Sequence, residues 1–235
     1  MNNNKQGIKL YCFSPLIMII TFVIEILMAL YTFIQSRKHK SDLGIVFLLI
    51  FLGLFQLSEY LICRNCSPLL WGRIGIFAIT FLPVLGIYII AKMNNNSKFL
   101  KLAVASSVAF ALYFVLAPNS ISDVTCSGNY IIFDIKSSIH ALYGYYYFGF
   151  LILGIWEANR SIKTNKSKAL KTAFKWLIVG YLSFILPLTA VYILIPITRA
   201  AIASVMCGFA VVFAIILTFK IAPIYHKHVK SKDKK

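Results

Sequence analysis

Glu25 is an acidic residue in the middle of a long apolar stretch, and no Lys or Arg in any apolar stretch lies at its depth. An ionised carboxylate inside an apolar helix is costly unless something compensates its charge. We therefore expect Glu25 to be protonated, hydrogen-bonded inside a helix bundle, or paired with a bound cation. Thr21 and Thr32 share its helical face by spacing, so they should point inward with it. The alternative to a functional site is a structural acid bonded to a neighbouring Tyr or Gln.

A second polar stripe follows in the next apolar stretch, where Gln56, Glu59 and Cys63 recur at i, i+3 and i+7 and so share one helical face. A third stripe descends the stretch that begins near residue 139, and it consists of His140, Tyr143, Gly144 and Tyr147.

Arg73 and Arg199 begin two further apolar stretches at the same level. These groups predict one outward-facing pocket with Glu25 at its floor and an arginine as counter-charge. The alternative for the Tyr, His and Arg residues is an interfacial belt, because such residues are common at headgroup depth.

Cysteine placement leaves several chemistries open. The candidates for disulfides are Cys12, Cys63, Cys66 and Cys126, which fall on the same side of the threading described below, whereas Cys207 lies inside an apolar stretch. In an oxidising compartment four such thiols form two disulfides, with three connectivities. They are alternatively free thiols, or Cys63 and Cys66 form a redox pair whose thiolate Arg64 favours.

Seven apolar stretches must position these groups. Each is long enough, at ~1.5 Å per helical residue, to cross or nearly cross a ~30 Å hydrocarbon layer. The predicted spans are 14–36, 43–63, 74–92, 101–117, 139–157, 175–195 and 200–221. With 60% hydrophobic residues in 235, the chain is too apolar for a soluble domain. We predict an all-α membrane protein, a single seven-helix domain over 14–221.

The basic residues set the expected orientation. Alternate threading leaves six of the 24 on one side and the other 18 on the opposite side. The six are Lys5, Lys9, Arg64, Arg73, Lys136 and Arg199. Because basic residues of short loops stay cytoplasmic, we expect residues 1–13 outside and a basic cytoplasmic tail over 222–235. We expect the first span to be retained, since no small-residue cleavage pattern follows it.

Two connections stand out in length. The external loop 118–138 contains a predicted hairpin, with strands at 124–126 and 130–133 around a Gly128-Asn129 turn. The cytoplasmic connection 158–174 carries several basic residues and is predicted to be helical or flexible.

Several functions are excluded. The net charge of +17 lies in loops beside membrane spans, which favours contact with anionic lipid headgroups and not with nucleic acid. A retinal site needs a lysine near the middle of the last span, and Lys220 is at its end. The four histidines do not cluster at one depth, and no phosphate-binding glycine loop appears. We expect no metal and no cofactor.

In their order along the chain, several short motifs resemble those of a prokaryotic family of small seven-span membrane proteins that has no known activity. The motifs are Cys12-Phe13-Ser14 at the first span, Gln56-Leu57-Ser58-Glu59 in the second, Cys126 before Tyr130 in the external loop, and Cys207 in the last span. The resemblance implies that Cys12, Gln56, Glu59, Cys126 and Cys207 are better candidates for function than their neighbours.

The leading hypothesis is a multi-pass protein of a prokaryotic cytoplasmic membrane that binds or transports a small ligand, ion or lipid. Its site would consist of Glu25, Gln56, Glu59 and His140, flanked by Tyr143 and Tyr147, with Arg73 or Arg199. The alternatives are an extracytoplasmic thiol-disulfide oxidoreductase using Cys63 and Cys66, and a membrane scaffold whose basic tail 227–235 recruits a partner.

Overall fold

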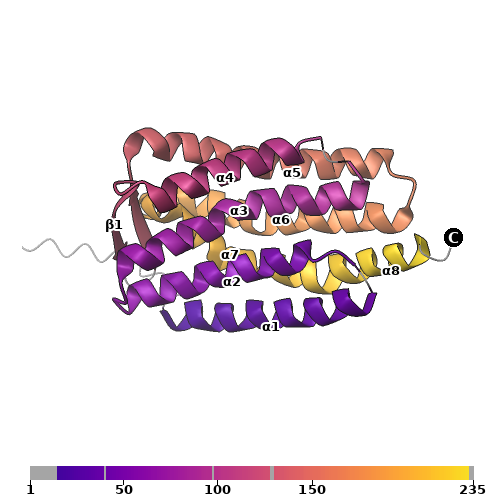
Figure 1. Cartoon of the computed structure of the whole chain (residues 1–235), viewed down its shortest axis with the longest axis horizontal. Helices are drawn as coiled ribbons and strands as arrows, with labels where there is room; N and C mark the ends of the chain where they lie inside the picture. Colours follow the sequence, from indigo (N-terminus) through magenta and orange to yellow (C-terminus); the bar gives the residue numbers. More distant parts are fainter. Residues whose placement is uncertain (1–14, 40, 97, 128–129, 233–235) are drawn as a thin grey trace, which may run out of the picture.

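The computed structural model describes residues 15–39, 41–96, 98–127 and 130–232 of the chain. These residues form a bundle of long helices that run side by side, with one β-hairpin across an end of the bundle (Figure 1). Large apolar side chains such as Leu27 and Ile34 remain exposed on the outside of the bundle. The architecture is that of a multi-pass membrane protein.

The helices alternate in direction, so each connection lies at one end of the bundle or the other. The first four are α1 (Pro15–His39), α2 (Gly44–Cys63), α3 (Pro68–Asn94) and α4 (Leu100–Leu116). After the hairpin come α5 (Ser137–Thr164), α6 (Lys168–Leu194), the 3-10 helix η2 (Pro196–Ala201) and α7 (Ile202–Ile216). The chain then continues through the π-helical turn η3 (Leu217–Ile221) into α8 (Ala222–Lys232).

Six helices in the described part of the chain are long and apolar enough to cross a membrane. They are α1, α2, α3, α5, α6 and the continuous helix from Ile202 to His228. The predicted fourth span is the exception: α4 has 17 residues and reaches about 25 Å at helical rise, short of a ~30 Å hydrocarbon layer. The structure therefore supports six spans, and a seventh crossing by α4 stays a prediction.

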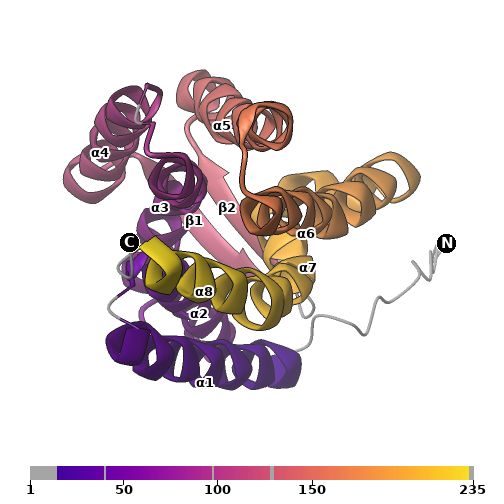
Figure 2. The same cartoon turned by 90° about the vertical axis from the view of Figure 1, so that its right-hand side faces the viewer.

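The predicted hairpin is present with longer strands. β1 (Ile121–Cys126) pairs antiparallel with β2 (Ile131–Ile135), in a register that sets Cys126 opposite Ile131. Residues 128 and 129 lie outside the described residues, so their turn type is not tested. In the view along the bundle, α8 lies in front and the hairpin crosses the far end of the bundle (Figure 2). Ile121, Val124, Ile131 and Phe133 are buried on the side that meets the helices.

The C-terminal segment 222–235 was predicted to be a basic tail, and the part of it that the structure describes is helical. Residues 222–232 form α8, which continues α7 through η3 and contacts α1 and α6. The π-helical turn η3 is wider than an α-helical turn, since the Ala222 N–H bonds to the Leu217 carbonyl five residues earlier. Pro223 explains this turn, because proline has no N–H to donate to the helical hydrogen bonds. The connection 158–174 is likewise mostly helical, since α5 ends at Thr164 and α6 begins at Lys168.

Tyr181 of α6 determines how closely three helices approach. Its buried side chain lies against two glycines, Gly86 in α3 and Gly154 in α5. A Cβ at Gly154 would lie 3.0 Å from the Tyr181 hydroxyl, and a Cβ at Gly86 would overlap it. Small residues at helix crossings permit this close approach in a membrane protein. Glycine at residue 86 is therefore required by the volume of Tyr181.

Replacing Gly86 by alanine should lower the free energy of unfolding by about 1–3 kcal/mol, since the added methyl group overpacks a filled core. Thermal unfolding of the detergent-purified protein measures the change. Adding Tyr181→Phe to Gly86→Ala should restore most of the loss by removing the overlapping oxygen. Gly149→Ala is the matched control, because a Cβ there meets nothing within 4 Å. Equal stability of the two alanine variants would contradict this account of the crossing.

Candidate functional site

The two acidic residues predicted for the site, Glu25 and Glu59, are buried and close together. Glu25 of α1, Gln56 and Glu59 of α2 are at most 2% exposed. The two carboxyl groups lie near enough for their charges to interact. Thr21 and Thr32 are buried on the same face of α1, as their spacing predicted. We call Glu25, Gln56 and Glu59 the acid cluster.

Ser204 of α7 connects the acid cluster to the hairpin. Its side chain hydrogen-bonds to Glu59, and its oxygen accepts the Ile131 N–H of β2 at 3.2 Å. One buried hydroxyl thus joins α2, α7 and β2. Cys207, one helical turn further along α7, is fully buried and lies close to both Glu25 and Glu59.

The acid cluster is incompletely bonded. Among the described residues, neither carboxyl oxygen of Glu25, nor Glu59 Oε1, nor Gln56 Nε2 has a hydrogen-bond partner. Buried polar groups are nearly always paired, because leaving one unpaired costs about 1–3 kcal/mol. Four such atoms within one cluster therefore indicate a place where a proton, a cation or a polar group completes the bonding.

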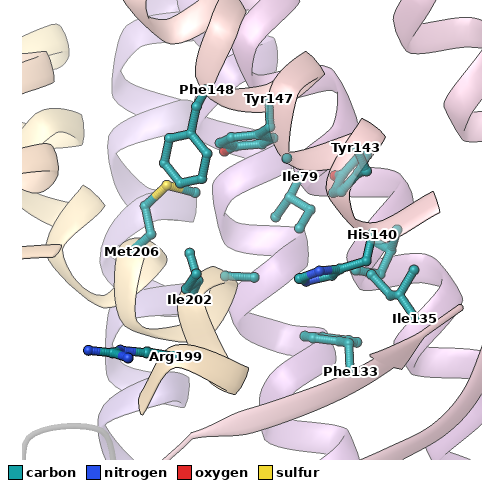
Figure 3. A pocket seen from close by; sticks show the side chains of 13 residues that line it. Ile79, Phe133, Ile135, His140, Tyr143, Tyr147, Phe148, Arg199, Ile202 and Met206 are labelled. Atoms are coloured by element: carbon teal, nitrogen blue, oxygen red, sulfur yellow. The ribbon is translucent and has the colours of Figure 1, made fainter. Parts of the chain in front are cut away.

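A separate cavity of about 110 Å³ opens beside the hairpin, between α3, α5, β2 and the start of α7 (Figure 3). We call it the outer cavity. Most of its surface is apolar, and its few polar groups are His140 and Tyr143 of α5, Tyr147 below them, and Arg199 of η2. The lining residues are Ile76, Ile79, Phe133, Ile135, His140, Tyr143, Gly144, Tyr147, Phe148, Arg199, Ile202, Ala203 and Met206.

The two ends of the outer cavity differ in character. His140 and Arg199 are exposed, and Figure 3 places them toward the hairpin on opposite sides of the cavity. Tyr147 and Phe148 close the other end, where Tyr147 is buried. The Arg199 Nε donates to the Tyr192 carbonyl at 3.1 Å and its guanidinium lies 5.0 Å from the Tyr192 ring centre. Figure 3 shows the Arg199 guanidinium directed away from the other lining side chains, so the cavity is apolar inside and has this cation at its edge.

A hydrogen-bonded group of α3 and α5 side chains fixes one wall of the outer cavity. The Thr80 hydroxyl lies 3.0 Å from the Tyr143 hydroxyl, and the Tyr146 hydroxyl donates to the Thr80 carbonyl at 2.6 Å. This carbonyl is near Pro83, whose missing N–H weakens the helical ladder of α3 at this point. The wall that carries Tyr143 is consequently held against α3 by polar contacts as well as by packing.

Of the two arginines predicted as alternatives for the counter-charge, Arg199 lines the outer cavity and Arg73 does not. The guanidinium donates to the Val115 carbonyl at 3.3 Å and to the Pro118 carbonyl at 2.8 Å. Carbonyls at a helix C-terminus lack partners within the helix, so Arg73 satisfies the end of α4 and the residues after it.

The single predicted pocket is in fact two sites. His140, Tyr143, Tyr147 and Arg199 surround the outer cavity, but none of the described acidic residues lines it. Tyr147, Met206 and Cys207 line a small inner void of about 20 Å³. Tyr147 and Met206 also line the outer cavity, whereas Cys207 lies close to the acid cluster. The spacing of polar residues predicts which face of one helix is buried, but it does not predict which faces of different helices meet.

The structure resolves the cysteine alternatives in part. Cys63 at the end of α2 is disulfide-bonded to Cys126 of β1. Cys66 is an exposed free thiol and Cys207 a buried one, whereas Cys12 lies outside the described residues. Cys63 and Cys66 are therefore not bonded to each other here, and redox turnover stays a prediction. The disulfide fixes the hairpin over the acid cluster, one helical turn above Glu59.

Sequence reasoning missed Ser204 as a part of this site. Its spacing of three from Cys207 puts both on one face of a helix, which was the available signal. Serine is common on such faces in membrane helices, so the pattern alone did not distinguish it.

Comparison with protein-family models, with curated proteins and with solved structures gives no match for this chain. The resemblance to a seven-span family therefore stays a prediction, and the site is interpreted from its geometry.

Ser204→Ala should destabilise the protein by about 1–3 kcal/mol, because it leaves both the buried Ile131 N–H and a Glu59 oxygen without a partner. Thermal unfolding in detergent measures the loss. Ser183→Ala is the matched control, since that hydroxyl donates only to the Gly180 carbonyl of its own helix. If the two variants unfold at the same temperature, Ser204 does not connect the hairpin to the acid cluster.

Proposed function

We propose that this multi-pass membrane protein binds a small amphipathic acid in the outer cavity. The ligand class is an aromatic or branched aliphatic body with one acidic group. The observation that carries the proposal is an apolar cavity whose mouth holds Arg199 and His140 and whose described lining includes no carboxylate. The sequence predicted binding or transport of a small ligand, and the proposal now names the outer cavity as the site and a small amphipathic acid as the ligand.

Cavity size supports a small ligand or the end of a longer one. An apolar cavity of ~150 Å³ binds benzene, so about 110 Å³ limits the buried group to a single ring or a short branched chain. Ile79, Phe148, Ile202 and Met206 offer such a group contacts on several sides. Burial of an apolar body supplies affinity, and a few placed polar groups supply orientation.

Charge at the mouth supports an acidic group. Arginine is always charged and offers several N–H donors in one plane, which suits a carboxylate or phosphate. The Nε of Arg199 is already bonded to the Tyr192 carbonyl, which orients the rest of the guanidinium. His140 stands across the mouth as a second donor.

We further propose the predicted arrangement in the membrane: seven crossings including α4, residues 1–13 outside, and the C-terminus in the cytoplasm of a prokaryotic cell. Basic residues at the ends of α1, α3 and α5 and at the start of α6 support this orientation, because they lie at the end of the bundle away from the hairpin. The outer cavity would then open to the extracytoplasmic side, and the basic end would contact anionic lipid headgroups.

The acid cluster is proposed to hold an ion that accompanies the ligand, most simply a proton on Glu25 or Glu59. Two adjacent carboxylates away from water do not both ionise without a compensating charge. Tyr147 and Met206 separate this cluster from the outer cavity, so their movement would connect the two sites. The oxidoreductase and scaffold alternatives stay predictions; an exposed Cys66 and the basic α8 are the features on which they rest.

Filling the outer cavity tests the proposal. A panel of phenylacetate, benzoate, isovalerate and octanoate should include an acid that raises the unfolding temperature of the purified protein. A ligand at 100 times its Kd adds about 2.7 kcal/mol to the free energy of unfolding. Gly144→Leu should abolish that shift, because a Cβ at Gly144 meets nothing within 4 Å and extends from the lining of the cavity.

Two further variants separate the parts of the proposal. Gly149→Leu on the same helix also projects into open space but does not line the cavity, so it should keep the ligand response. Arg199→Gln should weaken the response to the acids and spare any response to their uncharged amides. A protein that responds to none of the acids, or responds equally after Gly144→Leu, would disprove binding in this cavity.

A further inference from the structure

A second cavity, of about 300 Å³, lies at the opposite end of the bundle, between the last turns of α1 and the junction of η3 with α8. Figure 2 shows α1 and α8 side by side at this end. We call it the basic-end cavity. The residues that line it are Tyr31, Thr32, Gln35, His39, Thr218, Ala222, Pro223, His226 and Lys227. It shares none of these with the outer cavity.

Two threonines in this cavity behave unlike the others on helices. The Thr21, Thr80, Thr164, Thr172 and Thr189 hydroxyls each donate to a backbone carbonyl three or four residues earlier. By contrast, the hydroxyls of Thr32 and Thr218, both 1% exposed, have no partner among the described residues. The two come from different helices and line the same cavity. Unpartnered buried hydroxyls that converge on one space indicate a polar occupant.

The other polar groups of the cavity can all donate hydrogen bonds, and one of them, Lys227, is a cation. His226 is buried, its Nε2 lies 3.3 Å from the Ser36 hydroxyl, and its ring centre lies 5.3 Å from that of His39. Lys227 completes the rim, and Arg37 and Lys38 follow on the last turn of α1. No acidic residue among those described lines the cavity, and nearby Asp42 is bonded to Tyr88 and Gly44. The surroundings favour an anion.

The turn at η3 gives the cavity its shape. Pro223 removes one N–H from the ladder, and η3 adopts i→i+5 bonding, which widens the helix at Thr218. Single π-turns of this kind are frequent at functional sites. Here the turn forms the end of the last predicted apolar stretch, 200–221, so the widened segment lies close to the level expected for lipid headgroups.

We propose that the basic-end cavity binds a phosphate group, held by the hydroxyls of Thr32 and Thr218, the rings of His39 and His226, and the ammonium of Lys227. Hydroxyl, imidazole and ammonium donors around one space suit the several acceptor oxygens of a phosphate monoester. The group comes either from a lipid headgroup or from a soluble phosphate, and the test separates the two sources.

The test measures unfolding temperature with two probes. One is inorganic phosphate added to the detergent-solubilised full-length protein; the other is a nanodisc containing phosphatidic acid, compared with one of phosphatidylcholine alone. At least one probe should stabilise the protein. Stabilisation by both assigns a site open to soluble phosphate, and stabilisation by phosphatidic acid alone assigns a lipid headgroup.

The variants show whether the effect arises in this cavity. The double variant Thr32→Val and Thr218→Val keeps the side-chain shapes and every charge. It should lower the affinity for the stabilising probe at least tenfold. Lys227→Gln, which lies on the exposed rim and spares the interior, should weaken it as well. Controls are Thr172→Val with Thr189→Val, whose hydroxyls bond their own helices, and Lys220→Gln, whose ammonium lies over the Trp176 ring.

The proposal is overturned if neither probe stabilises the protein. It is equally overturned if the Thr32 and Thr218 variant and Lys227→Gln respond like their controls, because binding would then reflect general attraction to a basic surface.

Discussion

A carboxyl group cut off from water must find its partners inside the protein, and this constraint organises the bundle. Glu25 and Glu59 lie on different helices, and in a membrane an acid turned toward lipid is strongly unfavourable. The structure buries both and brings them together between α1, α2 and α7. Because these faces are fixed by the acids, large apolar residues occupy the remaining faces and are free to meet lipid.

The hairpin is attached to two helices next to Glu25 and Glu59, by the disulfide and by Ser204. The Cys63–Cys126 bond attaches β1 to the end of α2, and Ser204 attaches β2 to α7. The same hairpin contributes Phe133 and Ile135 to the outer cavity. The hairpin therefore covers both the outer cavity and the acid cluster. A ligand that moves the hairpin would also move Ser204, which is bonded to Glu59. The basic-end cavity is independent of this cover and depends on the turn at Pro223.

Helix positions and the hairpin were predictable because apolar length, charged loops and turn residues are local in sequence. The predicted span 43–63 differs from α2 by one residue at its start, and the predicted span 101–117 differs from α4 by one residue at each end. The meeting of helix faces was not predictable: Ser36 and His226 are 190 positions apart, and no pattern within either segment relates them. That residues 222–232 form a helix with one buried face was not predicted for a different reason, because the charge of this segment conceals the face that His226 gives to α8.

A double-mutant cycle of Glu25→Gln and Glu59→Gln tests the central claim, that the two carboxyl groups share one environment. Thermal unfolding of the four proteins in one detergent gives the coupling free energy. We predict non-additivity of about 1 kcal/mol or more, since either substitution alone relieves the same interaction. The two effects adding to within ~0.5 kcal/mol would contradict the account, because independent carboxyl groups behave in that way.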